Sequence, residues 1–363
     1  MVAAVLIAPL TLSACSGGGG TPASPGGESV PAPTGDRSLA ERLASTVTGS
    51  EAFVHLQALQ AVADRNGGNR AMGTPGYEQS VDYVADTLRR AGFAVQTPTM
   101  ALAPEEGGDG GEEESEGSTT AGSTRMVIAQ TTSGRVDEVV LSGAHLDSVP
   151  EGPGIDDDGS GVAAQLQIAL ELGADAPVTN AVRFVWFGAE EQGLLGSQAY
   201  VGGLSPDQRR DIALMLNSDV IAAPNGGYFV YDGDGSDGRN TEVAAPGSPA
   251  IERVLADRLA SQGVEPRGTP FIDDSDYGPF VAAGIATGGV FSGDSGTKTP
   301  EQARLWGGRA GAPFDPCYHQ ACDDLENIDR ARFDRMVTTL AYGIGAFALD
   351  LDGVPSRGER VAR

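Results

Sequence analysis

Positively charged residues are scarce in this chain of 363 residues. It has 24 Lys and Arg residues against 50 Asp and Glu residues, which gives a formal net charge of -26 and a sequence pI near 4.3. A surface with this charge repels the phosphate backbone of a nucleic acid, because binding to that backbone depends on neutralising phosphates with basic side chains. We therefore expect no nucleic-acid partner.

Long apolar runs are also missing. The one uninterrupted apolar stretch covers residues 1–12, which is shorter than the roughly 20 residues that a membrane-spanning helix needs. Ser13, Ala14 and Cys15 follow, and this arrangement is similar to a bacterial lipoprotein signal. The resemblance predicts a lipoprotein signal peptide at residues 1–14 and a lipid anchor at Cys15 that attaches the protein to the membrane. The alternative is an ordinary export signal with an incidental cysteine. Both interpretations place the protein in the cell envelope, either lipid-anchored to the outer face of the cell membrane or secreted.

Cysteine is rare as well. Besides Cys15, the chain has only Cys317 and Cys322, which are separated by four residues. In an oxidising compartment these two can form a disulfide that closes a small local loop. The loop contains Tyr318 and His319, so a bridge would stiffen both side chains. The alternative is two buried free thiols.

Hydrophobic residues make up 40% of the chain, enough to bury a large core. We expect a single domain at residues 39–352. Residues 15–38 are mostly Gly, Ser, Pro and Thr, which predicts a flexible tether. Within the domain, residues 105–120 predict an acidic, solvated surface loop, and residues 353–363 predict a short polar tail.

Helical and strand-like patterns alternate along the domain. Alternation of this kind predicts an α/β fold, a three-layer α/β/α sandwich around a mostly parallel mixed sheet. The predicted helices are 77–91, 161–172, 249–262 and 330–348, and the predicted strands are 93–95, 126–129, 138–142, 181–187, 213–217, 227–231 and 288–291.

Acidic residues and a histidine follow three consecutive predicted strands, 138–142, 181–187 and 213–217. The side chains are His145, Asp147, Asp157, Glu190, Glu191 and Asp219. In parallel sheets ligands bind beyond the carboxyl ends of the strands, so we expect these groups to share one crevice. Crowded carboxylates raise one another's pKa unless a cation neutralises them, and mixed imidazole and carboxylate ligands suit zinc.

Histidine is limited to three residues, and they differ in their surroundings. His145 and His319 lie in turn-rich segments beside acidic residues, which favours metal binding, whereas His55 is expected to be an ordinary hydrogen-bonded histidine. Asp147 lies two positions after His145, on the same side of an extended chain. We therefore expect Asp147 to hold the second ring nitrogen of the metal-binding histidine.

Five ordered motifs carry a resemblance to a known family. They are His145-Leu-Asp147-Ser-Val, Gly154-Ile-Asp-Asp157-Asp-Gly-Ser-Gly161, Trp186-Phe-Gly-Ala-Glu190-Glu191, Asn217-Ser-Asp219 and Cys317-Tyr-His319-Gln-Ala-Cys322. Residues 69–77 and 275–280 also fit. Together they resemble the family 28 metallopeptidases, the bacterial co-catalytic zinc aminopeptidases, over about residues 68–352.

The resemblance implies a role for each site residue. His145 and Asp219 would hold one zinc ion, Glu191 and His319 the other, and Asp157 would bridge both, so the cofactors are two Zn²⁺ ions per chain. Glu190 would be the general base and would help Asp219 bind the free amino group of a peptide, and Tyr318 would donate a hydrogen bond to the developing oxyanion. A cis peptide bond is implied after the bridging Asp157. The substrates are peptides with a free N-terminus, and we expect a monomer.

The substrate pocket is where this chain departs from the family. Asp274 stands where some relatives carry Arg, and the resemblance places Asp273 and Asp274 beside a pocket lined partly by Phe280 or Phe291. Apolar lining predicts a leucyl-type preference, whereas a carboxylate in the pocket predicts that Lys and Arg are accepted unusually well. The alternative is that both acids point into solvent and leave specificity unchanged.

The sequence is compatible with other functions. A related two-zinc carboxypeptidase or deacylase usually carries an inserted dimerisation domain, for which we find no room, and a non-catalytic surface lipoprotein conflicts with the intact motifs. Glutaminyl cyclase activity is a further alternative. Residues 232–238 have the composition of a calcium loop but lack the distal Glu of an EF-hand, so we interpret them as a turn and calcium as the lesser alternative.

Overall fold

The computed structural model describes residues 37–102, 122–237 and 244–360. The predicted signal peptide, Cys15, most of the predicted tether and the acidic loop at 105–120 lie outside these ranges. Within the described residues, no helix has both the length and the hydropathy to cross a membrane.

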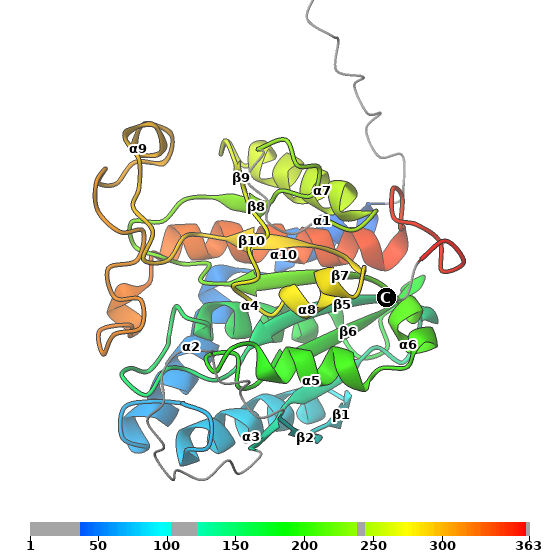
Figure 1. The fold of residues 1–363 in the computed structure, drawn as a ribbon, viewed down its shortest axis with the longest axis horizontal. Coiled ribbons are helices and arrows are strands. Elements are labelled where there is room, and N and C mark those ends of the chain that lie inside the picture. The colour runs from blue at the N-terminus through cyan, green and yellow to red at the C-terminus, as the bar shows by residue number, and fades with distance from the viewer. Residues whose placement is uncertain (1–36, 103–121, 238–243, 361–363) are drawn as a thin grey trace, which may run out of the picture. The chain divides into compact units, whose positions relative to one another are not determined.

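An eight-stranded mixed sheet forms the centre of the domain (Figure 1). Its strands, in spatial order, are β1 (Ala94–Gln96), β4 (Val127–Gln130), β6 (Asn180–Phe187), β5 (Arg135–His145), β7 (Ile212–Asp219), β10 (Ala286–Phe291), β8 (Phe229–Tyr231) and β9 (Arg267–Thr269). The four central strands, β6, β5, β7 and β10, are parallel to one another. Strands β2 (Thr99–Ala101) and β3 (Ser123–Arg125) form a separate antiparallel pair.

The side chains of the central strands pack alternately into two different cores, because neighbouring residues in a strand point to opposite faces of the sheet. Val140 and Ala144 of β5 belong to the larger core, and Leu141 belongs to the smaller one. Both faces are therefore apolar, which explains why these strands read as nearly continuous hydrophobic runs.

Helices cover both faces of the sheet (Figure 1). The larger core contains side chains from α1 (Ser38–Thr46), α2 (Gly49–Arg65), α3 (Pro75–Arg90), α4 (Gly159–Leu172), α7 (Ser248–Ser261) and α10 (Arg330–Leu349). The smaller core contains side chains from α5 (Leu195–Gly203) and α8 (Gly278–Ala282), and α6 (Pro206–Asp211) leads into β7. The remaining elements are α9 (Pro300–Trp306) and a short 3-10 helix, η1 (Leu325–Asn327). The three-layer α/β/α prediction is confirmed.

Capping residues account for the observed helix starts. Thr74 accepts a hydrogen bond from the backbone N–H of Tyr77, and Pro75 occupies the first turn, so α3 begins two residues before the predicted start. Asp158 caps α4 by accepting from Gly161 N–H. Helices α1 and α2 were not predicted from the sequence; α1 begins at Ser38, the last residue of the predicted tether.

The segment predicted as a polar tail packs against the domain up to residue 360. The Arg360 guanidinium forms an ion pair with Glu138, and both side chains are buried. Arg360 also donates a hydrogen bond of 2.8 Å to the carbonyl oxygen of Arg210. These contacts fasten the end of the chain to the amino-terminal side of the sheet.

Candidate two-metal site at the carboxyl edge of the sheet

Three neighbouring parallel strands end at the candidate site. His145 is the last residue of β5 and Asp219 is the last residue of β7, while Glu190 follows the end of β6 by three residues. The sheet order β6-β5-β7 places these ends side by side. The crevice expected from the sequence is therefore formed by adjacent strands.

Asp157 lies at the centre of the site, on the loop between β5 and α4, and each of its oxygens faces a different histidine. Its Oδ1 is 3.0 Å from His145 Nε2, and its Oδ2 is 3.2 Å from His319 Nε2. Asp219 Oδ1 lies 3.5 Å from the same nitrogen of His145, and Glu191 Oε2 lies 3.0 Å from the same nitrogen of His319. The Asp157–Asp158 peptide bond is cis.

Two groups of metal-binding atoms result, and they share Asp157. One group is His145, Asp157 and Asp219, the other is Asp157, Glu191 and His319, and the ligand atoms of each lie within 4.8 Å of one another. Glu191 Oε1 is buried without a hydrogen-bond partner, which is costly unless a cation compensates it. Imidazole nitrogen and carboxylate oxygen are ligands that suit zinc, so the donor set fits the metal that the resemblance implies.

Electrostatic interactions among the side chains of the site are strong. Burial alone would raise the pKa of Asp157, but hydrogen bonds from His145 and His319 outweigh it and lower that pKa. Hydrogen bonds to Asp157 and Glu191 raise the pKa of His319 to about 10. Burial lowers the pKa of His145, but the charges of Glu190 and Asp219 outweigh it and raise that pKa well above its usual value. In the absence of metal, these shifts favour the protonated form of both imidazoles.

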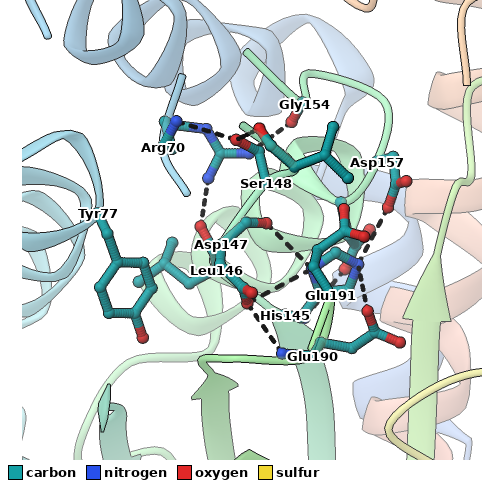
Figure 2. A network of polar contacts seen from close by, with 12 residues as sticks. Arg70, Tyr77, His145, Leu146, Asp147, Ser148, Gly154, Asp157, Glu190 and Glu191 are labelled. Carbon is teal, nitrogen blue, oxygen red and sulfur yellow. Dashed lines mark hydrogen bonds and ion pairs between the residues drawn. The ribbon is translucent and has the colours of Figure 1, made fainter. Parts of the chain in front are cut away.

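Glu190 lies beside His145 (Figure 2) and belongs to neither group of ligand atoms. Its Oε2 is 3.9 Å from His145 Nε2. Burial raises the pKa of Glu190 well above its usual value. A carboxylate next to the metal groups, with a raised pKa, is suited to accept a proton from a reacting water.

Asp147 contacts His145 in a different way from the one expected. The ring nitrogen Nδ1 of His145 is 3.1 Å from the backbone carbonyl oxygen of Asp147 and 3.8 Å from its carboxylate. The carboxylate instead accepts a hydrogen bond of 3.2 Å from the backbone N–H of Glu190 (Figure 2). Asp147 therefore connects the end of β5 to the segment that carries the candidate base.

Arg70 is buried and was not among the predicted site residues, although it lies in the motif at 69–77. Its guanidinium donates hydrogen bonds to the carbonyl oxygens of Leu146, Pro153 and Gly154, the one to Pro153 measuring 2.8 Å (Figure 2). Its backbone N–H donates to Ser148 Oγ at 2.9 Å. Arg70 therefore holds the loop that separates His145 from Asp157.

The loop with Tyr318 and His319 is closed by a disulfide between Cys317 and Cys322, so the disulfide prediction is confirmed. The two rings stack with their centroids 3.9 Å apart. Burial and neighbouring carboxylates, Asp157 first among them, raise the pKa of Tyr318. Its hydroxyl therefore keeps its proton and can donate a hydrogen bond.

A small pocket opens beside the site. Its lining includes Asp219, Tyr231, Asp274, Phe291, Asp294 and Tyr318. Asp274 and Phe291 were predicted there, whereas Asp294 was not, since it is separated from every motif in the sequence. Asp273 contributes to a different surface hollow with Gln198 and Pro279.

The placement of Phe280 in the pocket is wrong. Phe280 has no exposed surface and packs against Phe187 and Tyr200, with ring centroids 6.1 Å away in each case. It lies on α8, whose inward face completes the smaller core. Phe280 is therefore a core residue, although it is close to the site residues in sequence.

Two further predictions concern residues outside the site. His55 is buried and hydrogen-bonded, with Nδ1 2.7 Å from Tyr83 Oη and Nε2 3.3 Å from Gln167 Oε1, as expected of an ordinary histidine. Asp232 and Asp234 of the predicted turn and Glu252 of α7 bring carboxylate oxygens within 4.8 Å of one another. Calcium binding there stays the lesser alternative to a simple turn.

Comparison with known proteins identifies the family. Residues 126–344 match the model of peptidase family M28. The probable lipoprotein aminopeptidase LpqL of Mycobacterium tuberculosis is 36% identical, over 89% of this chain and 90% of that protein. The chain therefore belongs to peptidase family M28 and is a peptidase.

Other relatives extend the comparison. Leupeptin-inactivating enzyme 1 of Streptomyces exfoliatus is 41% identical over 80% of this chain, which spans only 60% of that enzyme's length. Among solved structures, the zinc aminopeptidase BSAP from Bacillus subtilis superposes with a TM-score of 0.65 at 18% identity, covering 86% of this chain and 98% of that one. Porphyromonas gingivalis glutaminyl cyclase superposes with a TM-score of 0.59, also at 18% identity, covering 82% of this chain and 98% of that one. These two structures show the same fold.

Proposed function

We propose that this chain is a metallo-aminopeptidase that hydrolyses the N-terminal residue of peptides at a site with two zinc ions. The observation that carries the proposal is the position of Asp157, whose two oxygens face two separate groups of ligand atoms. A single shared carboxylate is what a bridged pair of metal ions requires. His145 and Asp219 would complete one position, and Glu191 and His319 the other.

The residues of the chain supply the rest of the chemistry. Zinc at this site would lower the pKa of a bound water and polarise the carbonyl group of the scissile bond. Glu190 takes a proton from the attacking water and returns it to the leaving amine. Tyr318 donates a hydrogen bond to the negative charge that develops on the carbonyl oxygen.

Recognition of a free amino group gives aminopeptidase specificity. Glu190 and Asp219 each bring a carboxyl group beside His145, and Asp219 also lines the pocket. Both are suited to bind the α-amino group of a peptide. With the amino group held there, the side chain of the first residue would lie in the adjacent pocket. The aminopeptidase name of the relative from Mycobacterium tuberculosis supports this assignment.

The pocket supports a broad preference. Tyr231 and Phe291 offer apolar contact for Leu, whereas Asp274 and Asp294 offer carboxylates. We propose that Leu is accepted, that Lys and Arg are accepted unusually well, and that Asp and Glu are rejected through charge repulsion.

We propose the cell envelope as the location of the enzyme. The relative named as a lipoprotein matches 89% of this chain, and Ser13-Ala14-Cys15 follows an apolar run of signal-peptide length. Lipidation at Cys15 would leave residues 15–38 as a tether between the membrane and a monomeric domain at 39–352.

The decisive experiment measures zinc content and substrate choice together. We expect about two zinc ions per chain, as a bridged site requires, and cleavage of Leu-p-nitroanilide but not of an N-acylated peptide. Preferred cleavage of the acylated peptide would favour a carboxypeptidase or deacylase. Release of ammonia from an N-terminal Gln peptide would favour a glutaminyl cyclase, and inactivity of the zinc-loaded protein would favour a non-catalytic lipoprotein.

The Asp157→Ala variant tests the bridging role separately. Because Asp157 belongs to both groups of ligand atoms, its removal should cause loss of most zinc and of activity. Asp207→Ala, which removes a carboxylate from the short helix α6 away from the site, is the control and should keep both. Full zinc content in Asp157→Ala would contradict the bridged site.

A further inference from the structure

Asp323 joins the two loops that carry Asp157 and His319. Its Oδ1 accepts a hydrogen bond of 2.8 Å from the backbone N–H of Asp156, and its Oδ2 accepts one of 3.1 Å from the backbone N–H of Asp157. Its own carbonyl oxygen accepts a third, of 3.0 Å, from Ile155 N–H. Three consecutive backbone amides before α4 are therefore fixed to one residue.

The same residue is fixed within the loop that carries His319. Asp323 follows Cys322 directly, so the disulfide ties it to the far end of the loop. The Asn327 side-chain amide donates to Asp323 Oδ1 at 3.1 Å and to both oxygens of Asp315, at 3.0 and 2.9 Å. Asp315 in turn accepts from Cys317 N–H at 2.7 Å. Both ends of the disulfide loop thus meet at Asn327.

The two groups of ligand atoms are supported differently. His145 and Asp219 are the final residues of adjacent strands, and Asp219 Oδ2 also accepts a hydrogen bond of 2.7 Å from Ser275 Oγ. His319 lies on no strand or helix and is 42% exposed in its side chain. The sheet fixes the two ligands that belong only to the first group, whereas the position of His319 relative to the shared Asp157 depends on how their two loops are held together.

We propose that Asp323, oriented by Asn327, is a positioning residue that sets the distance between Asp157 and His319 and so controls the affinity of the second metal position selectively. Asp323 binds the backbone N–H of Asp157 and not its carboxylate. Its effect on the metal position is therefore indirect. The inference rests on the two-metal site proposed above and adds that the two positions differ in their dependence on loop structure.

The Asp323→Asn variant tests this. Asp156 N–H and Asp157 N–H bind different oxygens of Asp323. The substitution replaces one of these oxygens with an NH2 group, which donates and cannot accept, so one of the two backbone N–H groups loses its present partner. Zinc binding is measured by titrating the metal-free full chain in zinc buffers, which yields two dissociation constants. We expect one constant to rise about 10- to 100-fold, as is typical when a residue supporting a ligand is changed, and the other to stay within about threefold. The constant that rises should be the one that His319→Ala abolishes.

Controls separate this role from general destabilisation. Glu326→Gln removes an exposed carboxylate three residues away and should leave both constants unchanged. Asn327→Asp places a third carboxylate against Asp315 and Asp323, so it should reproduce the selective effect even if Asp323→Asn folds poorly. At saturating zinc, kcat of Asp323→Asn should recover to within about threefold of the wild type, because base and ligands are intact.

Three results would overturn the inference. They are unchanged constants in both variants, an equal rise of both constants, and a selective rise of the constant that His145→Ala abolishes. A wild-type chain that binds a single zinc ion would instead refute the two-metal proposal, and the inference with it. A wild type with two zinc ions and a variant with both constants intact would refute the inference alone.

Discussion

The carboxylate of Asp147 accepts a hydrogen bond from the backbone N–H of Glu190 at 3.2 Å. Asp147 thereby links β5, which ends in the ligand His145, to the segment after β6 that carries the candidate base. A base and a ligand held by one intermediate residue keep a fixed relative position, which proton transfer in a transition state requires.

We expect Glu190→Gln to retain about two zinc ions per chain but to lose most of its turnover. The amide cannot accept the proton of the attacking water, and loss of a general base costs roughly 100- to 10,000-fold in rate. Zinc content and kcat for Leu-p-nitroanilide, measured on the same preparation, check this. Near-normal kcat would show that another group is the base.

Zinc binding to the metal-free enzyme should release protons. The pKa of His319 is about 10 in the absence of metal, and the pKa of His145 is also raised, so both imidazoles are charged at pH 7. Zinc requires the neutral form. We expect release of about two protons from the histidines per chain and a zinc affinity that increases with pH. Titration calorimetry in buffers of different ionisation enthalpy measures the protons, and their absence would contradict the protonated site.

The stability of the metal-free enzyme should fall as pH rises. The folded-state pKa of His319 is raised from 6.5 to about 10, and burial raises that of Glu191 from 4.5 to about 7. A raised pKa stabilises the folded state below the unfolded-state value, and this stabilisation is lost as pH rises through the folded-state value. The thermal midpoint should therefore decrease between pH 5 and pH 10, as these shifts require. The zinc-loaded enzyme is the comparison, and a flat profile for the metal-free form would refute the prediction.

Removal of the Cys317–Cys322 disulfide should weaken both metal retention and activity, because the bridge closes the loop of Tyr318 and His319. In the chain-entropy model, a loop this short contributes about 2 kcal/mol to the free energy of unfolding. The Cys317→Ser/Cys322→Ser double variant should show this loss in urea denaturation, with a faster loss of zinc to a chelator. Two free thiols in mass spectra of the exported, unreduced protein would remove the basis of the prediction.

The acidic pocket should set part of the specificity. We expect Asp274→Ala to lower the ratio of kcat/KM for Lys to that for Leu substrates by roughly two- to fivefold, the range for a solvent-accessible ion pair. Asp273→Ala is a matched control, since it removes a neighbouring carboxylate that lines a different hollow. An unchanged ratio in Asp274→Ala would leave the leucyl-type preference standing without a contribution from this acid.

Much of the fold and of the candidate site could be predicted from the sequence, because the patterns that define them lie within short segments. The apolar runs buried on both faces, the acidic residues directly after them and the two cysteines five positions apart each define a feature within a short segment. Parallel strands bring their carboxyl ends to one edge of a sheet, so residues such as His145 and Asp219 could be expected to meet.

Only the tertiary structure decided the features that join distant segments. Asp323 lies more than 160 residues from Asp156 and Asp157, to which it is hydrogen-bonded, and Asp294 reaches the pocket from a loop without a motif. Phe280 shows the same limit, because an aromatic residue near a pocket in sequence can face either the pocket or the core. Such contacts depend on how the loops and helices pack, since local sequence patterns define an element and its buried face but not its partner.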